Sequence, residues 1–476
     1  MKKLTAVLLL AITVLCAGTS CRRLEPMVII PQKDIPQDTY IRLADGVSKE
    51  MTYASYWQKE EYDKTVMSLS QISKFNKENL NLISTKTGGN MALTDYPETI
   101  DGGMVRDIID LLPLTDEDKE LFVNTQSVNA DYWARLERNI NKDGVPSRVN
   151  VKYGFSTQRA TLRKFPTADY ANDEIDDLYY DKFIMSDYMP FTPLVIIHES
   201  ADGEWYLISM YGYSGWIQKE YTAVCQSKNE WLKRQNPDDF LVVTGNQITL
   251  ADDPYCKELS LQNVPMGTKM ELVKAEDAPE IINSRATYGD YIVKLPVRQA
   301  DGSISDGYSL IPASSDVSTG YLPYTRNNVI EQALKFQGGA YGWAGSLNSN
   351  DCSGIIRQIY LTFGLELPRR ATQQTLVKGI VKEDMTETAD IVKMEKLRNT
   401  PAGSLLFFEG HIMIFLGVDG DEPYCISSVG SISTPEMEEG EYLNVNNIMI
   451  TSMLRTSRKT GKSWLTALEK ILIIET

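Results

Sequence analysis

The sequence predicts a multidomain α+β protein, and three observations lead to this fold class. The chain has 476 residues, which is enough for about three domains. Short strands joined by tight turns run through residues 149–322, a pattern typical of small β-barrels. In residues 323–476, helices precede antiparallel strands, as in an α+β layer. A mainly helical domain over residues 49–148 completes the predicted order.

The composition excludes several classes of protein. Apolar residues make up 42% of the chain and charged residues 24%, values that are ordinary for globular proteins. They exclude a disordered chain and a polytopic membrane protein. The 48 basic and 64 acidic residues leave a net charge of −16. Because nucleic-acid binding needs a basic surface, we expect no nucleic-acid partner.

The N-terminus predicts export. A basic start is followed by an apolar run over residues 4–15, which is too short to span a bilayer and is typical of a secretory signal. Small residues directly before Cys21 resemble a bacterial lipoprotein signal, whose cysteine is acylated. We therefore expect a signal peptide over residues 1–21, a tether over 22–48 and a membrane-anchored lipoprotein in the periplasm or cell envelope. Ordinary cleavage near the same place is the alternative.

The N-terminal domain is expected to be helical because its apolar residues recur at helical spacing. One such series predicts a helix that begins near residue 64, and its apolar face holds Val66, Leu69, Ile72 and Phe75. Further short helices are expected over residues 104–112 and 116–122. No cluster of residues here indicates chemistry.

Two barrels are expected next, over residues 149–228 and 229–322. In the first, an apolar strand over 193–198 and a strand over 205–210 flank the tight turn at Asp202 and Gly203. A third strand follows over 213–217. The second unit has strands of the same kind without a strict internal repeat, and the two units are interpreted as divergent copies.

The C-terminal domain, residues 323–476, begins with a helix that Thr325 can cap. Cys352 opens a second helix that Gly364 ends. Two apolar strands, 405–408 and 412–416, then form a hairpin with His411 at its mouth. This order can bring a cysteine and a histidine together from different elements.

The cysteines and histidines narrow the chemistry. The cysteines after the signal peptide are scattered and form no CxxC motif, so neither a disulfide framework nor a structural zinc site is expected. We expect no metal and no organic cofactor. The chain has only two histidines, His198 and His411. His198 is most simply a barrel strand residue, which leaves His411 as the candidate base.

Cys352 is the candidate nucleophile. The free N–H groups at a helix start carry partial positive charge, which favours a thiolate. Paired with the imidazole of His411, such a thiol can attack an amide, and its own N–H can donate to the oxyanion. An isolated cysteine is more often a small core residue. The polar neighbours Asp351 and Ser353 favour a site instead.

Four ordered blocks resemble the NlpC/P60 cysteine peptidases: residues 340–345, 351–354, 363–369 and 403–408 before His411. The resemblance implies a papain-like fold over about residues 326–475. It also implies hydrolysis of peptidoglycan stem peptides or muropeptides, at the bond between the γ-carboxyl of D-glutamate and a diamino acid. The diamino acid is expected to be meso-diaminopimelate.

The resemblance assigns roles to individual residues. It makes Cys352 the nucleophile and His411 the base, and it places the hydroxyl of Tyr341 at the oxyanion site. The third catalytic residue falls at Ser427, where family members usually carry His, Asn or Gln. A serine hydroxyl orients an imidazole more weakly, so reduced activity or a substitute acceptor from the backbone stays open.

Substrate contacts follow from the same resemblance. Asp351 and Ser353 match positions that contact a free N-terminus in tripeptide-specific members, although Asp351 is equally well explained as a helix cap. Ala371 departs from the serine that many members carry. Residues 159–216 resemble a bacterial SH3 domain, which in related enzymes walls the cleft and restricts it to released stem peptides. Tyr213 and Asp181 are the candidate barrel contacts, with an ordinary surface role as the alternative.

Three readings of function remain open. The first is an exported, monomeric cysteine peptidase of the γ-D-glutamyl-diamino acid type. The second is a catalytically degenerate lipoprotein that binds peptidoglycan, for which Ser427 is the best support. The third is a thiol amidase or acyltransferase, because water or an amine can capture an acyl-enzyme. Substitution of Cys352 would end turnover and leave binding intact.

Overall fold

The architecture is described from a computed structural model that covers residues 41–84, 93–112, 120–175 and 177–475. Leu43–Thr476 forms a single compact unit. The predicted signal peptide and Cys21 lie outside the described residues, as does most of the tether. Within the described ranges, the helices are all too short or too polar to cross a membrane.

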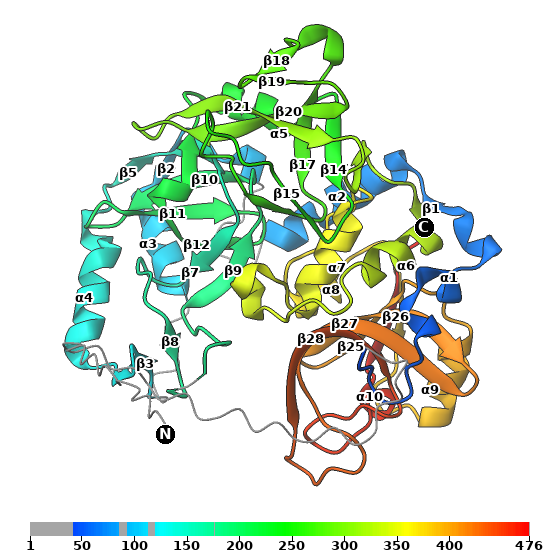
Figure 1. Cartoon of the computed structure of the whole chain (residues 1–476). Coiled ribbons are helices and arrows are strands. Elements are labelled where there is room, and N and C mark those ends of the chain that lie inside the picture. Colours follow the sequence, from blue (N-terminus) through cyan, green and yellow to red (C-terminus); the bar gives the residue numbers. More distant parts are fainter. Residues whose placement is uncertain (1–40, 85–92, 113–119, 176, 476) are drawn as a thin grey trace, which may run out of the picture. The chain divides into compact units, whose positions relative to one another are not determined.

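The segment expected as a separate helical domain consists of short elements (Figure 1). They are η1 (Glu50–Thr52), α1 (Ala54–Trp57), η2 (Glu60–Asp63), β1 (Thr65–Met67), α2 (Leu69–Ser84), η3 (Leu93–Asp95), β2 (Thr99–Asp101), α3 (Gly102–Leu111), β3 (Phe122–Val123), β4 (Gln126–Ser127), α4 (Ala130–Ile140), η4 (Lys142–Gly144) and β5 (Arg148–Asn150). The helix expected over 104–112 is α3. The other helix was expected over residues 116–122. Residues 116–119 lie outside the described part, and Phe122 opens a strand.

These elements divide between two hydrophobic cores. Ile72 and Phe75 of α2 are buried in the core of the C-terminal domain, whereas Val105 and Ile108 of α3 are buried in the core of the first barrel. The expected helical face was partly wrong, because Leu69 is exposed. Amphipathic spacing shows that a helix covers a core, but it does not show which core.

The first barrel is a seven-stranded antiparallel sheet in the order β13-β6-β10-β11-β12-β7-β9. Its strands are β6 (Lys152–Ser156), β7 (Ala160–Arg163), β9 (Ile184–Tyr188), β10 (Pro193–Glu199), β11 (Trp205–Met210), β12 (Tyr213–Gln218) and β13 (Thr222–Val224). β8 (Ala171–Asn172) pairs with β3, and η5 (Lys219–Tyr221) and α5 (Lys228–Gln235) complete this part. The middle of β10, residues 194–197, is continuously apolar because alternate residues enter two different cores. The expected turn is present, with Gly203 at φ +77°.

The second unit holds a five-stranded sheet in the order β21-β20-β17-β14-β22. Its elements are β14 (Phe240–Val243), β15 (Gln247–Thr249), β16 (Asn263–Pro265), β17 (Lys269–Val273), η6 (Ala275–Asp277), β18 (Ile281–Ile282), β19 (Arg285–Ala286), β20 (Asp290–Arg298), β21 (Ile304–Pro312) and β22 (Val317–Thr319). The apolar inner residues of β14, β17 and β20 form its core. This sheet has a different strand order from the first.

The C-terminal domain packs helices on a six-stranded sheet in the order β24-β29-β25-β26-β27-β28. Its elements are β23 (Tyr324–Thr325), α6 (Arg326–Leu334), η7 (Trp343–Asn348), α7 (Cys352–Leu361), α8 (Ala371–Gln374), β24 (Val381–Asp384), α9 (Asp390–Arg398), β25 (Leu405–Phe408), β26 (His411–Asp419), β27 (Glu422–Ile432), β28 (Leu443–Ser452), α10 (Trp464–Ala467) and β29 (Lys470–Ile473). Thr325 caps α6 by accepting the Asn328 N–H. The expected hairpin is β25–β26, in which Phe408 pairs with His411.

Candidate active site

Cys352 is the first residue of α7, as the sequence predicts. The carboxylate of Asp351 caps this helix by accepting the Gly354 N–H at 2.8 Å. The backbone N–H groups of Ser353 and Ile412 face the sulfur of Cys352 and act to lower the pKa of its thiol. Because Ile412 directly follows His411 in β26, the helix start and the start of this strand meet at the thiol.

The ring of His411 is held on two sides. Its Nε2 lies 3.0 Å from Oγ of Ser427 in β27, and the aromatic rings of Phe408 and Trp464 pack against it at 5.5 and 5.1 Å. Ser427 is completely buried. When Nε2 carries the proton and donates to this hydroxyl, Nδ1 keeps its lone pair and is the nitrogen available to the thiol.

Burial sets the resting protonation of the pair. Burial, together with the negative charge of Asp351, raises the pKa of the Cys352 thiol to about 12. Burial and the positive charge of Arg458 lower the pKa of His411 to about 4. A helix terminus favours a thiolate, as predicted from the sequence, but the cost of desolvating a charge exceeds that effect here. In the free protein, a neutral thiol therefore lies beside a neutral imidazole.

Tyr341, which the resemblance places at the oxyanion site, borders the same cleft as Cys352. Its ring is 6.1 Å from that of Tyr180 in the first barrel. Burial, with further contributions from the charges of Asp351, Tyr180 and Cys352, raises the pKa of Tyr341 well above its usual range. The hydroxyl therefore stays protonated and is able to donate to a developing oxyanion.

Asp351 is already paired. Arg369 donates from Nη1 and Nη2 to its two carboxylate oxygens at 2.8 and 2.9 Å, and Ser353 Oγ donates to it at 3.1 Å. Both predicted contacts of a substrate amine border the cleft. The guanidinium satisfies much of the negative charge that was expected to attract an ammonium.

A line of charges continues from this pair into the first barrel. Arg369 also donates to Asp187 Oδ1 of β9 at 3.3 Å, and Arg159 donates to Asp187 Oδ2 at 2.7 Å. Gly345 leaves the necessary space, because a Cβ there would lie 2.1 Å from the Asp187 side chain. Arg369, Asp187 and Arg159 were not predicted from the sequence as part of the site. The one local signal that could have indicated them is Arg369 itself, which follows Pro368 in the block 363–369.

The two barrel residues that were candidates for substrate contact, Tyr213 and Asp181, lie in different places. Tyr213 borders the cleft, and its hydroxyl accepts a hydrogen bond from Arg370 Nε at 2.9 Å. Asp181 is only 2% exposed, is paired with Arg163 at 3.0 Å and is absent from the cleft wall. Its expected role in substrate contact is therefore corrected to a structural one inside the barrel. His198 lies in β10, where its Nε2 lies 2.9 Å from the backbone oxygen of Asn141.

The cleft has a volume of about 660 Å³, and both the first barrel and the C-terminal domain form its walls. Its barrel wall includes Lys164, Tyr180, Ile184, Met185 and Tyr213. Opposite lie the cations Arg370, Arg458 and Lys459, which the sequence analysis did not single out. Among the described residues, no group of three His, Cys, Asp or Glu side chains is arranged to hold a metal ion.

Comparison with known proteins supports the family assignment. Residues 338–466 match the model of the NlpC/P60 family. These residues form an NlpC/P60 domain. Residues 170–218 match the model of an SH3 domain of the SH3b1 type, so an SH3b domain precedes the NlpC/P60 domain.

Individual relatives cover different parts of the chain. "Dipeptidyl-peptidase 6" of Lysinibacillus sphaericus is 32% identical over 124 residues, which are 26% of this chain and 36% of that protein. The chain thus matches about a third of the length of this curated relative. An NlpC/P60 endopeptidase from Photobacterium damselae subsp. piscicida has a TM-score of 0.67 at 16% identity, over 88% of this chain and 96% of its own. This likeness supports the fold across all the parts described above.

A further solved structure, an NlpC/P60 family protein from Bacillus cereus, has a TM-score of 0.45 at 16% identity and covers 67% of this chain and 98% of its own. The family model and the likeness of fold to the Photobacterium protein assign an NlpC/P60 domain to the C-terminal part of the chain. The bond, the substrate and the residues that act are a matter for proposal.

Proposed function

We propose that the chain is an exported cysteine peptidase that hydrolyses the γ-D-glutamyl–diamino acid bond of peptidoglycan stem peptides. The observation that carries this proposal is the meeting of two elements. The thiol of Cys352 lies against the first residues of β26, where Ser427 and two aromatic rings hold His411. This arrangement falls within the segment that matches the NlpC/P60 model.

The geometry suits a stepwise thiol mechanism. His411 Nδ1 removes the proton from Cys352 as the sulfur attacks the scissile carbonyl. The backbone N–H of Cys352 and the hydroxyl of Tyr341 donate to the oxyanion. The imidazolium then gives its proton to the leaving amine, and water hydrolyses the thioester. Because the resting pair is neutral, proton transfer accompanies the attack and does not precede it.

The charges of the cleft suit an acidic peptide. Arg370, Arg458 and Lys459 line it, and a stem peptide offers carboxylates from D-glutamate and from meso-diaminopimelate. The first barrel closes one wall, which favours short released peptides over intact murein. A free N-terminal L-alanine would approach Asp351, where Arg369 already binds, so the ammonium would share this carboxylate with the guanidinium.

A binding protein is the second candidate, and the serine that partners His411 at position 427 is the observation that favours it, because a hydroxyl orients an imidazole more weakly than His, Asn or Gln. Burial also raises the pKa of the Cys352 thiol, and a thiol that resists ionisation is a poorer nucleophile. On this reading, the chain is a degenerate peptidoglycan-binding lipoprotein. An amidase or acyltransferase would use the same thiol and differ only in the acceptor of the acyl group.

Mass spectrometry of the mature chain, residues 22–476, incubated with L-Ala-γ-D-Glu-meso-diaminopimelate tests the proposal. The same peptide with an acetylated N-terminus and the Cys352→Ala variant are the controls. Release of L-Ala-D-Glu by the wild type alone supports the peptidase. Cleavage of both peptides keeps the peptidase and removes the amine site at Asp351, whereas no cleavage of peptide or murein favours the binding protein.

Export and anchoring are proposed from the N-terminal sequence. Acylation of Cys21 would place the enzyme on a membrane surface in the periplasm or cell envelope. We expect the full chain to partition into detergent and Cys21→Ser to stay in the aqueous phase. Equal partitioning of the two proteins would contradict the lipid anchor and leave the peptidase proposal untouched.

A further inference from the structure

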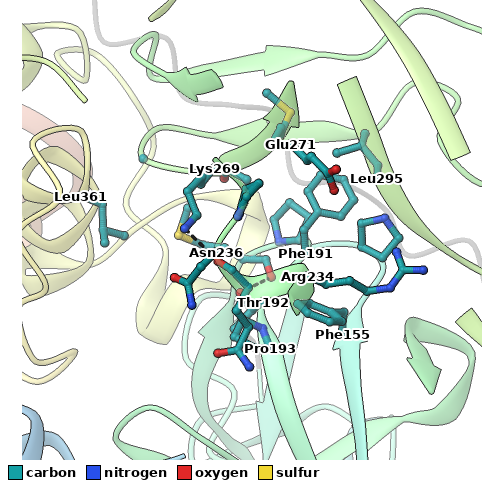
Figure 2. Close-up of a pocket in the computed structure, with 18 of the residues that line it drawn as sticks. Phe155, Phe191, Thr192, Pro193, Arg234, Asn236, Lys269, Glu271, Leu295 and Leu361 are labelled. Atoms are coloured by element: carbon teal, nitrogen blue, oxygen red, sulfur yellow. Dashed lines mark hydrogen bonds between the residues drawn. The ribbon is translucent and has the colours of Figure 1, made fainter. Parts of the chain in front are cut away.

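A second cavity lies at the other end of the catalytic helix. It has a volume of about 270 Å³, and residues of the first barrel, the second unit and α7 line it. In Figure 2, Leu361 of α7 and Leu295 of β20 lie on opposite sides, with Phe155 and Pro193 of the first barrel below. None of these residues borders the cleft at Cys352.

Two of the cations that line this cavity are already paired. Arg234 forms ion pairs with Glu230 and Asp306, and Lys294 forms one with Glu271. These pairs need no ligand. Their presence shows that the cavity wall can satisfy its charges internally where it has the partners.

Three other charged groups that line the cavity have no such ion pair within the described ranges. Among the residues that the structure describes, no ion pair is formed by Arg357, Lys269 or Glu366. The guanidinium of Arg357 has one hydrogen bond, to the thioether of Met189 at 3.7 Å, and a thioether is a weak acceptor. Lys269 Nζ donates to the backbone oxygen of Gln235 at 2.9 Å. All three are half-buried and border the cavity.

Leaving such charges without partners is costly. Burial raises the pKa of Glu366 and lowers that of Lys269, while the attraction between Glu366 and the two cations opposes both shifts. The carboxylate of Glu366 and the cations of Arg357 and Lys269 thus line the same cavity without forming an ion pair with one another. A guanidinium binds a carboxylate well, with two parallel hydrogen bonds where the geometry allows, and a carboxylate binds an ammonium.

We propose that this cavity binds a small zwitterion, an α-amino acid with an apolar side chain. Its carboxylate would contact Arg357 and Lys269, its ammonium would contact Glu366, and its side chain would pack on Leu295, Leu361 and Phe191. Small-molecule sites are usually about 300 Å³ or larger and combine apolar walls with a few polar groups. This cavity, at about 270 Å³, is just below that size and suits a small ligand, and its lining has the same mixed character. The inference does not depend on the proposed peptidase activity.

Isothermal titration of the full chain with leucine tests the proposal, with both enantiomers as probes. Two analogues separate the charges: 4-methylpentanoate lacks the amine, and 3-methylbutylamine lacks the carboxylate. We expect saturable binding of at least one enantiomer, and binding weaker by about tenfold or more for each analogue, the loss of about 1.4 kcal/mol. Absence of leucine binding would overturn the proposal.

Substitution of the three charged residues tests whether leucine binds in this cavity. Arg357→Met and Lys269→Met should each weaken leucine binding at least about tenfold, and Glu366→Gln should weaken leucine while leaving 4-methylpentanoate unchanged. Equal binding by all variants would overturn the proposal, as would a loss of binding after alkylation of Cys352. Thermal unfolding of each variant checks its fold, and because three different substitutions are used, misfolding of one does not remove the test.

Discussion

The two β-rich units that precede the C-terminal domain meet α7, the helix that begins at Cys352, at opposite ends. The first barrel meets its start, where Asp187 binds Arg369 and Tyr213 binds Arg370. The second unit meets its last turn, where Gly267 comes so close that a Cβ would lie 2.6 Å from Leu361 and 2.7 Å from the backbone oxygen of Gln358. One contact is made by charge and the other by close backbone approach.

This difference shows why a similar architecture need not mean a similar role. Side chains of the first barrel enter the wall of the cleft that holds Cys352, whereas those of the second unit form part of the separate cavity. The first barrel therefore can influence substrate and thiol directly. The second unit supports the helix and borders a space of its own.

Removal of Arg369 should have the largest effect. Arg369→Met takes a shared partner from the buried carboxylate of Asp187 and the half-buried carboxylate of Asp351, which should cost about 3–5 kcal/mol in the free energy of unfolding and abolish turnover. Arg163→Met is the matched control, because it breaks a buried pair with Asp181 inside the barrel. Urea denaturation and peptide cleavage should show two destabilised proteins, of which only Arg163→Met keeps kcat/KM in its folded fraction. Full activity of Arg369→Met would contradict the role given to the first barrel.

The reactivity of two thiols sharpens the comparison. Cys352 in the cleft and Cys256 in the second unit are both half-buried, and burial raises the pKa of each. Below a raised pKa, the thiolate fraction grows tenfold for each pH unit. The rate at which iodoacetamide alkylates each thiol, measured by mass spectrometry from pH 6 to 9, should therefore rise about a thousandfold without a plateau. A constant rate for Cys352 alone would show a thiolate–imidazolium pair and contradict the neutral resting state.

Local signals in the sequence were sufficient to predict the elements that carry Cys352 and His411. Polar residues around Cys352 marked the helix start, and the apolar hairpin placed His411 at its mouth. The resemblance proposed Ser427 as the partner of His411, and its hydroxyl lies 3.0 Å from His411 Nε2. These residues are within 80 positions of one another, and regular elements fix their relation.

The remaining parts of the site depend on long-range pairing, for which the sequence carries no periodic signal. Arg369 and Asp187 are 182 residues apart, and many carboxylates of this acidic chain were equally plausible partners. Asp181 was chosen by resemblance, but its own neighbour Arg163 binds it. For the same reason, the sequence predicted the helices α2 and α3 without showing that they cover different cores.

A smaller effect is expected within the catalytic group. Ser427→Ala removes the hydrogen bond to His411 Nε2 and leaves the packing of Phe408 and Trp464, so the ring keeps much of its position. We expect kcat to fall about tenfold, equivalent to ~1.4 kcal/mol, with KM unchanged because the substrate does not contact this buried residue. Ser427→Asn, which returns the usual kind of residue, should recover part of the loss if the site accommodates its volume. Unchanged kcat in Ser427→Ala would show that another group orients the imidazole.

The smallest effect should come from the barrel tyrosine. Tyr213→Phe removes the hydroxyl that accepts from Arg370 but keeps the ring, over which the Arg370 guanidinium lies at 4.8 Å. Because an arginine released from one hydrogen bond keeps its charge and its contact with the ring, KM for the peptide should rise about two- to fivefold with little change in kcat. The control is Tyr308→Phe, an exposed tyrosine of the second unit. If the first barrel alone borders the substrate, only Tyr213→Phe changes KM. Equal changes in both variants would place the second unit in substrate binding as well and end the distinction between the two.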